Sequence, residues 1–177
     1  MRPLPVDGAG VRVALPDDWA VTHPQYDGSV WYRAAFDRPA GTEPDDLLAL
    51  YVERVCSTLQ VNLNGHRIFV AGHLQEPVTR NCHYPQLVTL PAALLKQEGN
   101  VLDLKVQGSA LQKVAALQRA AGLSALKIGA LEALAAEHAR HEFWSVGSVK
   151  IVNLMLAVLG GVMIMVGALY RREAHIG

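Results

Sequence analysis

Hydrophobic and polar side chains alternate with a period of two in short runs over the first hundred or so residues. The run TLQVNLN at 58–64 alternates aliphatic residues with amides, and VLDLKV at 101–106 alternates them with Asp103 and Lys105. Because successive side chains of a strand point to opposite faces, this alternation predicts strands with one buried and one wet face. Together with runs rich in β-branched and aromatic residues, the predicted strands are Val11–Leu15, Val30–Asp37, Leu47–Arg54, Thr58–Asn64, His66–Ala71, Gln86–Leu90 and Val101–Val106.

Turn signals separate these runs. Asn64-Gly65 predicts a hairpin, since a type I′ turn needs positive φ at both central residues. Gly99-Asn100 turns the chain into the last of these strands, and Pro91–Lys96 is typical of one helical turn that opens with proline. Many short strands with frequent turns indicate a mainly β sandwich.

The pattern changes after Gly108. Ser109–Ala121 is rich in alanine, leucine and glutamine and is compatible with a helix or an ordered loop, and Leu123–Ile128 with a final strand. Ala130–Trp144 places apolar residues on one face at helical spacing, so we expect a helix there.

An uncharged apolar run follows from Ile151 to Tyr170. About twenty apolar residues are what a helix needs to cross a bilayer. The alternative is a buried core helix, but a core helix of this length usually keeps a polar face. Arg171 and Arg172 follow the run and Lys150 precedes it, which favours a cytoplasmic C-terminus under the positive-inside rule.

Composition sharpens this picture in two ways. Apolar residues make up 51% of the 177 residues and charged residues 18%, below the roughly 25% of an ordinary soluble domain, and much of the apolar excess lies in the run 151–170. The 16 basic and 16 acidic side chains give zero net charge, which argues against a nucleic-acid partner.

Catalytic motifs are missing from the sequence: it has no G-x-S-x-G, P-loop, H-E-x-x-H or GxGxxG. We therefore predict no enzymatic activity, no catalytic residue and no cofactor. His138 and His141 stand three residues apart on the predicted helix, but without a third ligand we read them as a solvated helix face and predict no metal site.

Three segments resemble the galactose-binding-like jelly roll, the sugar-binding module of family 2 glycoside hydrolases. They are VWYRAAFD at 30–37, VNLNGHRI at 61–68 and YPQLVTLPAALLKQEGNVLDLKV at 84–106. With QRAAGLSALKIGALEAL at 118–134 and the apolar run, nearly the whole chain resembles the extracytoplasmic sensor region of bacterial membrane histidine kinases and diguanylate cyclases. The resemblance implies an extracytoplasmic jelly roll over 1–129, a juxtamembrane helical connector over 130–148, a transmembrane helix over 149–172 and a cytoplasmic stub at 173–177.

The two cysteines, Cys56 and Cys82, are an even pair in what we expect to be an extracytoplasmic β domain. Such a pair predicts a disulfide that ties the loop carrying Cys82 to the sheet. The alternative is two unrelated buried thiols.

Ligand contacts are predicted in that loop. Arg80, Asn81, His83 and Tyr84 combine hydrogen-bonding groups with an aromatic ring. The alternative is a structural loop pinned by the disulfide.

One further ligand contact is predicted at Tyr32. It should face away from Trp31 and Arg33, its neighbours on the predicted strand, and we expect Trp31 in the core rather than as a ligand platform.

The main functional hypothesis is a non-catalytic, membrane-anchored sensor region of a histidine kinase-like signal-transduction protein. Any kinase or cyclase module would lie outside this sequence, and we expect the sequence to be the front part of a longer protein. The alternative is a carbohydrate-binding, membrane-anchored module without signalling output. A third hypothesis is an assembly protein that pairs through Gly160, Gly161 and Gly167, although a GxxxG spacing is absent.

The expected partners are a small molecule, a carbohydrate or a periplasmic protein, together with membrane lipid. We also expect a second copy, paired through the connector and the span. The expected location is the bacterial inner membrane, with the N-terminal domain in the periplasm.

Overall fold

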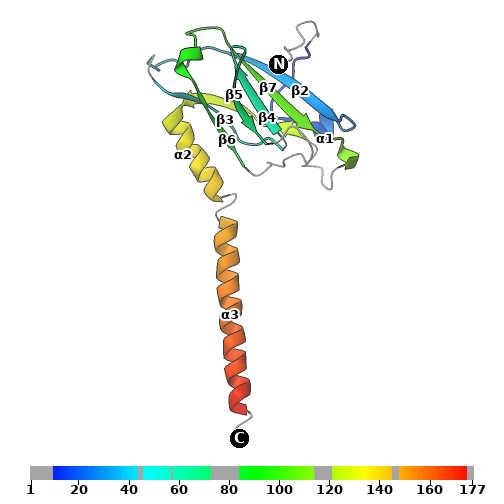
Figure 1. Ribbon diagram of the computed structural model, residues 1–177, viewed down its shortest axis with the longest axis vertical. Coiled ribbons are helices and arrows are strands. Elements are labelled where there is room, and N and C mark those ends of the chain that lie inside the picture. The colour runs from blue at the N-terminus through cyan, green and yellow to red at the C-terminus, as the bar shows by residue number, and fades with distance from the viewer. Residues whose placement is uncertain are drawn as a thin grey trace.

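The computed structural model describes residues 10–43, 46–56, 58–72, 84–113, 121–144 and 148–174. Two antiparallel sheets face each other, and two helices follow them (Figure 1). The described part of the chain is therefore a β-sandwich with a helical extension, which confirms the predicted mainly β class.

The larger sheet contains four strands, and every pair of neighbours in it is antiparallel. In spatial order they are β2 (Gly28–Phe36), β7 (Asn100–Gly108), β4 (Thr58–Leu63) and β5 (His66–Ala71). The nine-residue pairing of β2 with β7 runs from Gly28 opposite Gly108 to Phe36 opposite Asn100. This register decides which side chains lie next to one another on the outer face.

The smaller sheet contains β6 (Gln86–Leu90), β3 (Leu48–Val52) and β9 (Leu126–Ala130), with β3 in the middle. A separate short pair is formed by β1 (Asp17–Asp18) and β8 (Gly122–Leu123), and a single bridge joins Leu123 to Val55, shortly after β3. The remaining short elements are α1 (Trp19–Thr22), η1 (Ala92–Leu94) and η2 (Leu111–Lys113).

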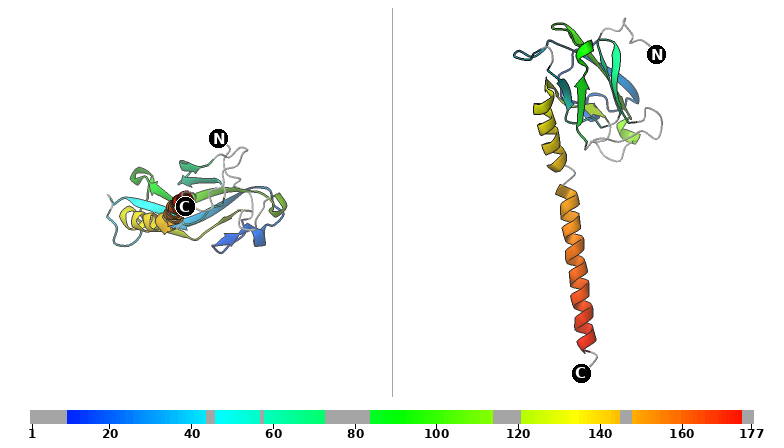
Figure 2. Two further views of the ribbon diagram at one scale, coloured as in Figure 1. Left: turned by 90° about the horizontal axis from the view of Figure 1, so that it is seen from below. Right: turned by 60° about the vertical axis from the view of Figure 1, so that its left-hand side comes forward.

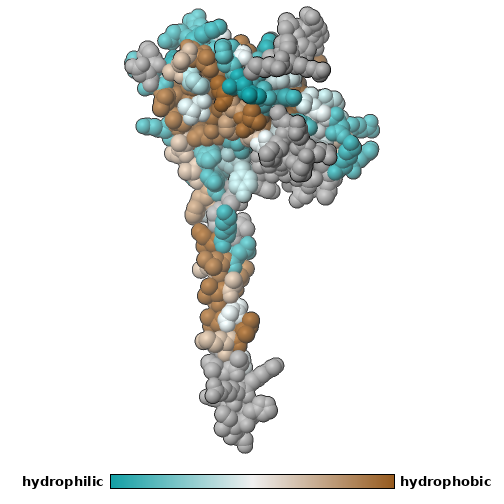
Figure 3. Space-filling model, viewed as in Figure 1, coloured by the Kyte–Doolittle hydropathy of each residue, from teal (hydrophilic) through white to brown (hydrophobic). Residues whose placement is uncertain are grey.

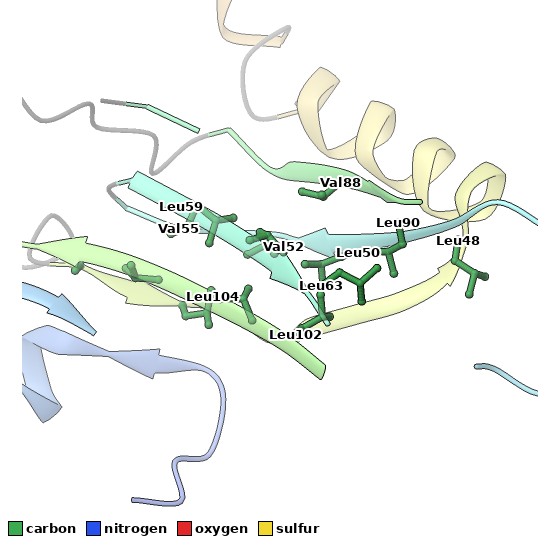
Figure 4. Close-up of a cluster of buried hydrophobic side chains, with 14 of the residues drawn as sticks. Leu48, Leu50, Val52, Val55, Leu59, Leu63, Val88, Leu90, Leu102 and Leu104 are labelled. Carbon is green, nitrogen blue, oxygen red and sulfur yellow. The ribbon is translucent and has the colours of Figure 1, made fainter. Parts of the chain in front are cut away.

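Aliphatic side chains fill the space between the two sheets (Figure 4). The alternating residues of β4 and β7 that the sequence placed on one face are fully buried here. They meet the inward side chains of β3 and β6, such as Leu50 and Leu90. Removing this apolar area from water is the main force that holds the sheets together.

Strand β3 is buried along its whole length. Leu48, Leu50 and Val52 face the other sheet. Ala49 and Tyr51 face the opposite way and pack with Leu134 of α2 (Leu131–Glu142). The helix therefore covers the outer side of the smaller sheet (Figure 1).

The predicted hairpin at Asn64-Gly65 is confirmed. Asn64 has φ of 49° and Gly65 of 86°, the positive values that a type I′ turn requires. The Asn64 side chain also donates to the carbonyl of Leu94 at 2.7 Å and accepts from the backbone N–H of Val101 at 2.9 Å. This side chain joins the hairpin to the segment that precedes β7.

The helical turn predicted within Pro91–Lys96 is present as η1, and the helix predicted over Ala130–Trp144 as α2. The prediction of a strand at Val11–Leu15 is wrong. That segment has no strand pairing and exposes Val11 and Val13 to solvent, because no sheet edge lies against it within the described residues.

Helix α3 (Ser148–Ala174) extends away from the sandwich as a straight rod (Figures 1 and 2). Its described apolar side chains are exposed, from 48% at Ile151 to 75% at Ile164, and they form the apolar shaft in Figure 3. Over the residues that the structure describes, no helix is both long and apolar enough to cross a membrane. The span over 149–172 is thus not confirmed.

Candidate functional site

Most of the predicted ligand loop lies outside the described residues: Arg80, Asn81 and His83 do, and so does Cys82. Tyr84 is described and is 48% exposed, and its carbonyl accepts a hydrogen bond from the Gln86 side chain at 2.9 Å. Contact between this loop and a ligand remains a prediction.

Cys56 lies just after β3 and is disulfide-bonded. Its predicted partner Cys82 is outside the described residues, so the pairing itself remains a prediction.

Tyr32 faces the interior, where a chain of hydrogen bonds engages its hydroxyl. The hydroxyl donates to Oδ2 of the buried Asp17 at 2.6 Å and accepts from Nε1 of the fully buried Trp19 at 2.6 Å. Burial, followed by the hydrogen bond to Asp17, raises the pKa of Tyr32 above its ordinary range. The hydroxyl therefore serves the packing of α1 onto β2.

Trp31 lies on the other side of β2, and its prediction as a core residue is wrong. It stands opposite Lys105 of β7, whose Nζ is 5.8 Å from the centre of the indole ring. The interior position next to it belongs to Tyr32, which packs against the core. An indole on the outer face is a large, partly exposed aromatic surface that is available for stacking.

Arg33 and Asp103 form the second cross-strand pair of this outer face. The Arg33 guanidinium donates through Nε to Oδ1 at 2.7 Å and through Nη2 to Oδ2 at 3.1 Å, a bidentate geometry. The Asp103 side chain is 4% exposed, whereas that of Arg33 is 64% exposed. Hydrogen bonding to Asp103 raises the pKa of Arg33, which keeps the guanidinium charged.

Two amides of β4 extend these pairs into rows. Gln60 stands opposite Lys105 and Asn62 opposite Asp103, and Gln60 Nε2 donates to Asn62 Oδ1 at 3.0 Å. One row across the sheet is therefore Trp31, Lys105 and Gln60, and the next is Arg33, Asp103 and Asn62. We call these six residues the polar face.

The polar face offers an aromatic ring, two cations and two amides across three strands, a width of roughly 10 Å. Such groups bind by stacking and hydrogen bonding. The carboxylate of Asp103 is held by Arg33.

A small hollow lies near Cys56. It is lined by Asp17, Asp18, Arg54, Cys56, Ala121 and Gly122. Both aspartates serve local structure, since Asp17 accepts from Thr22 and Tyr32 and Asp18 caps α1 through the N–H of Ala20.

No group of histidine, cysteine or acidic residues in the described ranges is arranged to hold a metal ion. The interpretation of His138 and His141 as a solvated helix face needs correction. His138 meets the ring of Tyr51 edge-on at 6.3 Å and hydrogen-bonds the carbonyl of Pro85 at 3.1 Å. His141 lies 3.4 Å from Glu53. Both face the smaller sheet.

Sequence reasoning missed the polar face as a unit. The alternation in 58–64 and 101–106 did place Gln60, Asn62, Asp103 and Lys105 on a wet face. The pairing of Arg33 with Asp103, 70 residues apart, requires the register of β2 against β7. That register is a long-range property, which local patterns do not specify.

Comparisons with known proteins give little beyond the fold. No protein-family model and no curated protein matches the sequence. Similar solved structures include a family GH2 β-galacturonidase from Eisenbergiella tayi, at 16% identity and a TM-score of 0.42, over 55% of this chain and 15% of that one. A β-glucuronidase from Faecalibacterium prausnitzii matches at 22% identity and a TM-score of 0.42, over 60% of this chain and 17% of that one.

An α-L-rhamnosidase from Streptomyces avermitilis, complexed with L-rhamnose, matches at 15% identity and a TM-score of 0.38. The match covers 59% of this chain and 8% of the enzyme. The chain thus spans less than a fifth of each of these three enzymes. With TM-scores below 0.5, the matches decide no ligand. All three are glycosidases, so the resemblance to kinase or cyclase sensor regions gains no support from them.

Proposed function

We propose that this chain is a non-catalytic binding module for carbohydrate, with the polar face as its binding surface, and that α3 anchors it in a membrane. The observation that carries the proposal is the position of Trp31 beside the Arg33–Asp103 pair on the outer face of the larger sheet.

The chemistry of a sugar matches the polar face. The less polar side of a pyranose ring stacks on an aromatic ring, and its hydroxyls both donate and accept hydrogen bonds. Arg33 and Lys105 supply donors, and Gln60 and Asn62 supply both donors and acceptors. Since Lys105 lies over the indole ring, a stacking sugar would displace its flexible side chain from Trp31.

The anchor rests on the sequence of the run 151–170 and on the exposed apolar side chains of α3. Exposing so large an apolar surface to water is unfavourable, whereas lipid accepts it. With Arg171 and Arg172 after the run, we place the C-terminus in the cytoplasm and the sandwich in the periplasm of a bacterial inner membrane.

A glycan array probed with the full chain in detergent tests the proposal. We expect binding to at least one class of glycan, and Trp31→Ala should weaken it by about tenfold or more, since a stacked ring contributes about 1 kcal/mol beyond its buried area. Trp144→Ala is the matched control, because it removes another exposed indole, one far along the chain from the polar face. Binding that survives Trp31→Ala unchanged would exclude the polar face.

The second candidate function is the sensor region, favoured by the contact of α2 with the smaller sheet. Because α2 packs on Tyr51 and the chain continues from it to α3, a shift of α2 would reach the anchor. Cysteine crosslinking between copies along 131–144, with and without a bound glycan, tests this. Identical patterns in both states would exclude the coupling.

A further inference from the structure

Helix α2 is held on the smaller sheet by different forces along its length. Its first turns are fixed by packing, since Leu134 is buried against Ala49 and Tyr51. The N–H of Leu131 also donates to the carbonyl of Leu47 at 2.8 Å. From residue 135 onward no apolar side chain of α2 is buried. Besides the edge-on contact of the His138 ring with Tyr51, the described contacts of these last turns with the sheet are polar.

His138 makes the first of these polar contacts. A carbonyl only accepts hydrogen bonds, so the 3.1 Å contact with the oxygen of Pro85 requires a proton on Nε2. The other ring nitrogen, Nδ1, lies 3.8 Å from Oε2 of Glu142. In the neutral ring Nδ1 presents a lone pair to that carboxylate. In the imidazolium it presents an N–H, so protonation replaces a repulsion by an ion pair. Glu142 lies on the same helix, so this pair steadies the last turn of α2 and the ring that donates to Pro85.

His141 makes the second contact, which joins α2 to the residue that follows β3. Its Nε2 lies 3.4 Å from Oε1 of Glu53, which directly follows β3. Protonation of His141 therefore adds an electrostatic attraction to Glu53 that holds the last turn of α2 against the sheet. Both side chains are about half exposed, so solvent screening keeps the attraction modest.

Other charged and titratable groups also face this side of α2. Lys127 of β9 pairs with Glu137 of α2, and its Nζ lies 5.8 Å from the centre of the Tyr51 ring. Arg140 is a further cation near that ring. Lysine, arginine and glutamate ordinarily stay charged between pH 5 and 8. Burial raises the pKa of Tyr51, so it stays neutral there.

The two histidines also contact residues on either side of the segment 56–82, which includes β4 and β5. Glu53 lies three residues before Cys56, and Pro85 lies three residues after Cys82. One turn of α2 thus contacts both sides of the segment that the predicted disulfide would close.

We propose that His138 and His141 form a proton-operated latch, which holds the last turns of α2 on the smaller sheet at acidic pH and releases them as the pH rises. Release leaves the first turns docked through Leu134 and frees the end of α2 that leads to α3. The latch is independent of which ligand the polar face takes.

Hydrogen exchange of the full chain in detergent tests the latch. After correction for the intrinsic exchange rate, amides of 137–142 should be protected about fivefold more at pH 5.5 than at pH 7.5, as two partly exposed ion pairs would give. Strand β7 serves as the internal reference, and its protection should not change. The double variant His138→Gln and His141→Gln should lose the difference, whereas His66→Gln, at an exposed position of β5, should keep it.

A second pair of variants separates the latch from a general loss of structure. Glu142→Gln and Glu53→Gln keep both histidines and remove the carboxylates they face. Together these two changes should also abolish the pH dependence. The latch is overturned if the wild-type protection of 137–142 does not depend on pH, or if the dependence survives in either double variant.

Discussion

At the scale of single residues, the packing around Trp19 leaves no free space. A Cβ on Gly108 would lie 2.4 Å from Cβ of Ala121 and 2.5 Å from Cζ3 of the fully buried Trp19. Gly108→Ala should therefore destabilise the fold by about 1–3 kcal/mol through overpacking. Gly129→Ala is the matched control, because its nearest contact would be an ordinary 3.9 Å to Leu134. Denaturant unfolding of both variants measures the difference, and equal stabilities would contradict the packing argument.

Tyr32 should make the free energy of unfolding depend on pH in the alkaline range. Its pKa is raised in the folded protein by burial and by Asp17, whereas in the unfolded chain a tyrosine titrates near pH 10. Above about pH 10 the unfolded chain therefore binds fewer protons, and the free energy of unfolding falls as the pH rises. Below that pH the stabilisation is complete.

Unfolding experiments between pH 9 and 11 measure this slope. Tyr32→Phe should reduce it, and Tyr84→Phe, at a tyrosine that is 48% exposed, is the control. Part of the slope should survive in Tyr32→Phe, because burial also raises the pKa of Tyr51. A slope that Tyr32→Phe does not alter would contradict the assignment.

At the scale of elements, Asn64 links the β4–β5 hairpin to its neighbours. Its side chain contacts Leu94, Asn100 and Val101 through three hydrogen bonds, at 2.7, 3.1 and 2.9 Å. Asn64→Ala should cost about 1–3 kcal/mol, because partly buried partners would lose their bonds. Asn62→Ala, which removes one hydrogen bond on the outer face, should cost less. Equal losses of unfolding free energy in the two variants would contradict the linking role of the Asn64 side chain.

The elements also show why sequence reasoning succeeded where it did. Alternation along 58–64 and 101–106 predicted the buried faces of β4 and β7, because the period of a strand is a local property. Trp31 was assigned to the wrong side of its strand, since in VWYR both faces carry aromatic rings and the pattern does not distinguish them. The contacts of His138 and His141 with the sheet depend on where α2 docks, which a helical period alone does not fix.

At the scale of the whole molecule, a sandwich with an ordinary core carries a rod of exposed apolar side chains (Figure 3). The sandwich buries its leucines and valines, whereas α3 exposes Leu159 by 60% and Met163 by 71%. The two parts therefore suit different surroundings, a contrast that the concentration of apolar residues in 151–170 already indicated.

This contrast yields a test of the proposed anchor. Wild-type chain expressed in bacteria should stay with the membrane pellet after carbonate extraction. Leu159→Lys with Met163→Lys should release it, since each lysine near the middle of a span costs about 2.5–3.5 kcal/mol. Val21→Lys is the matched control, because Val21 is 79% exposed on α1 and a charge there should not alter the partition. If the wild type is itself extracted, or the double variant remains in the pellet, α3 is not the anchor, and its apolar shaft must then be covered by protein.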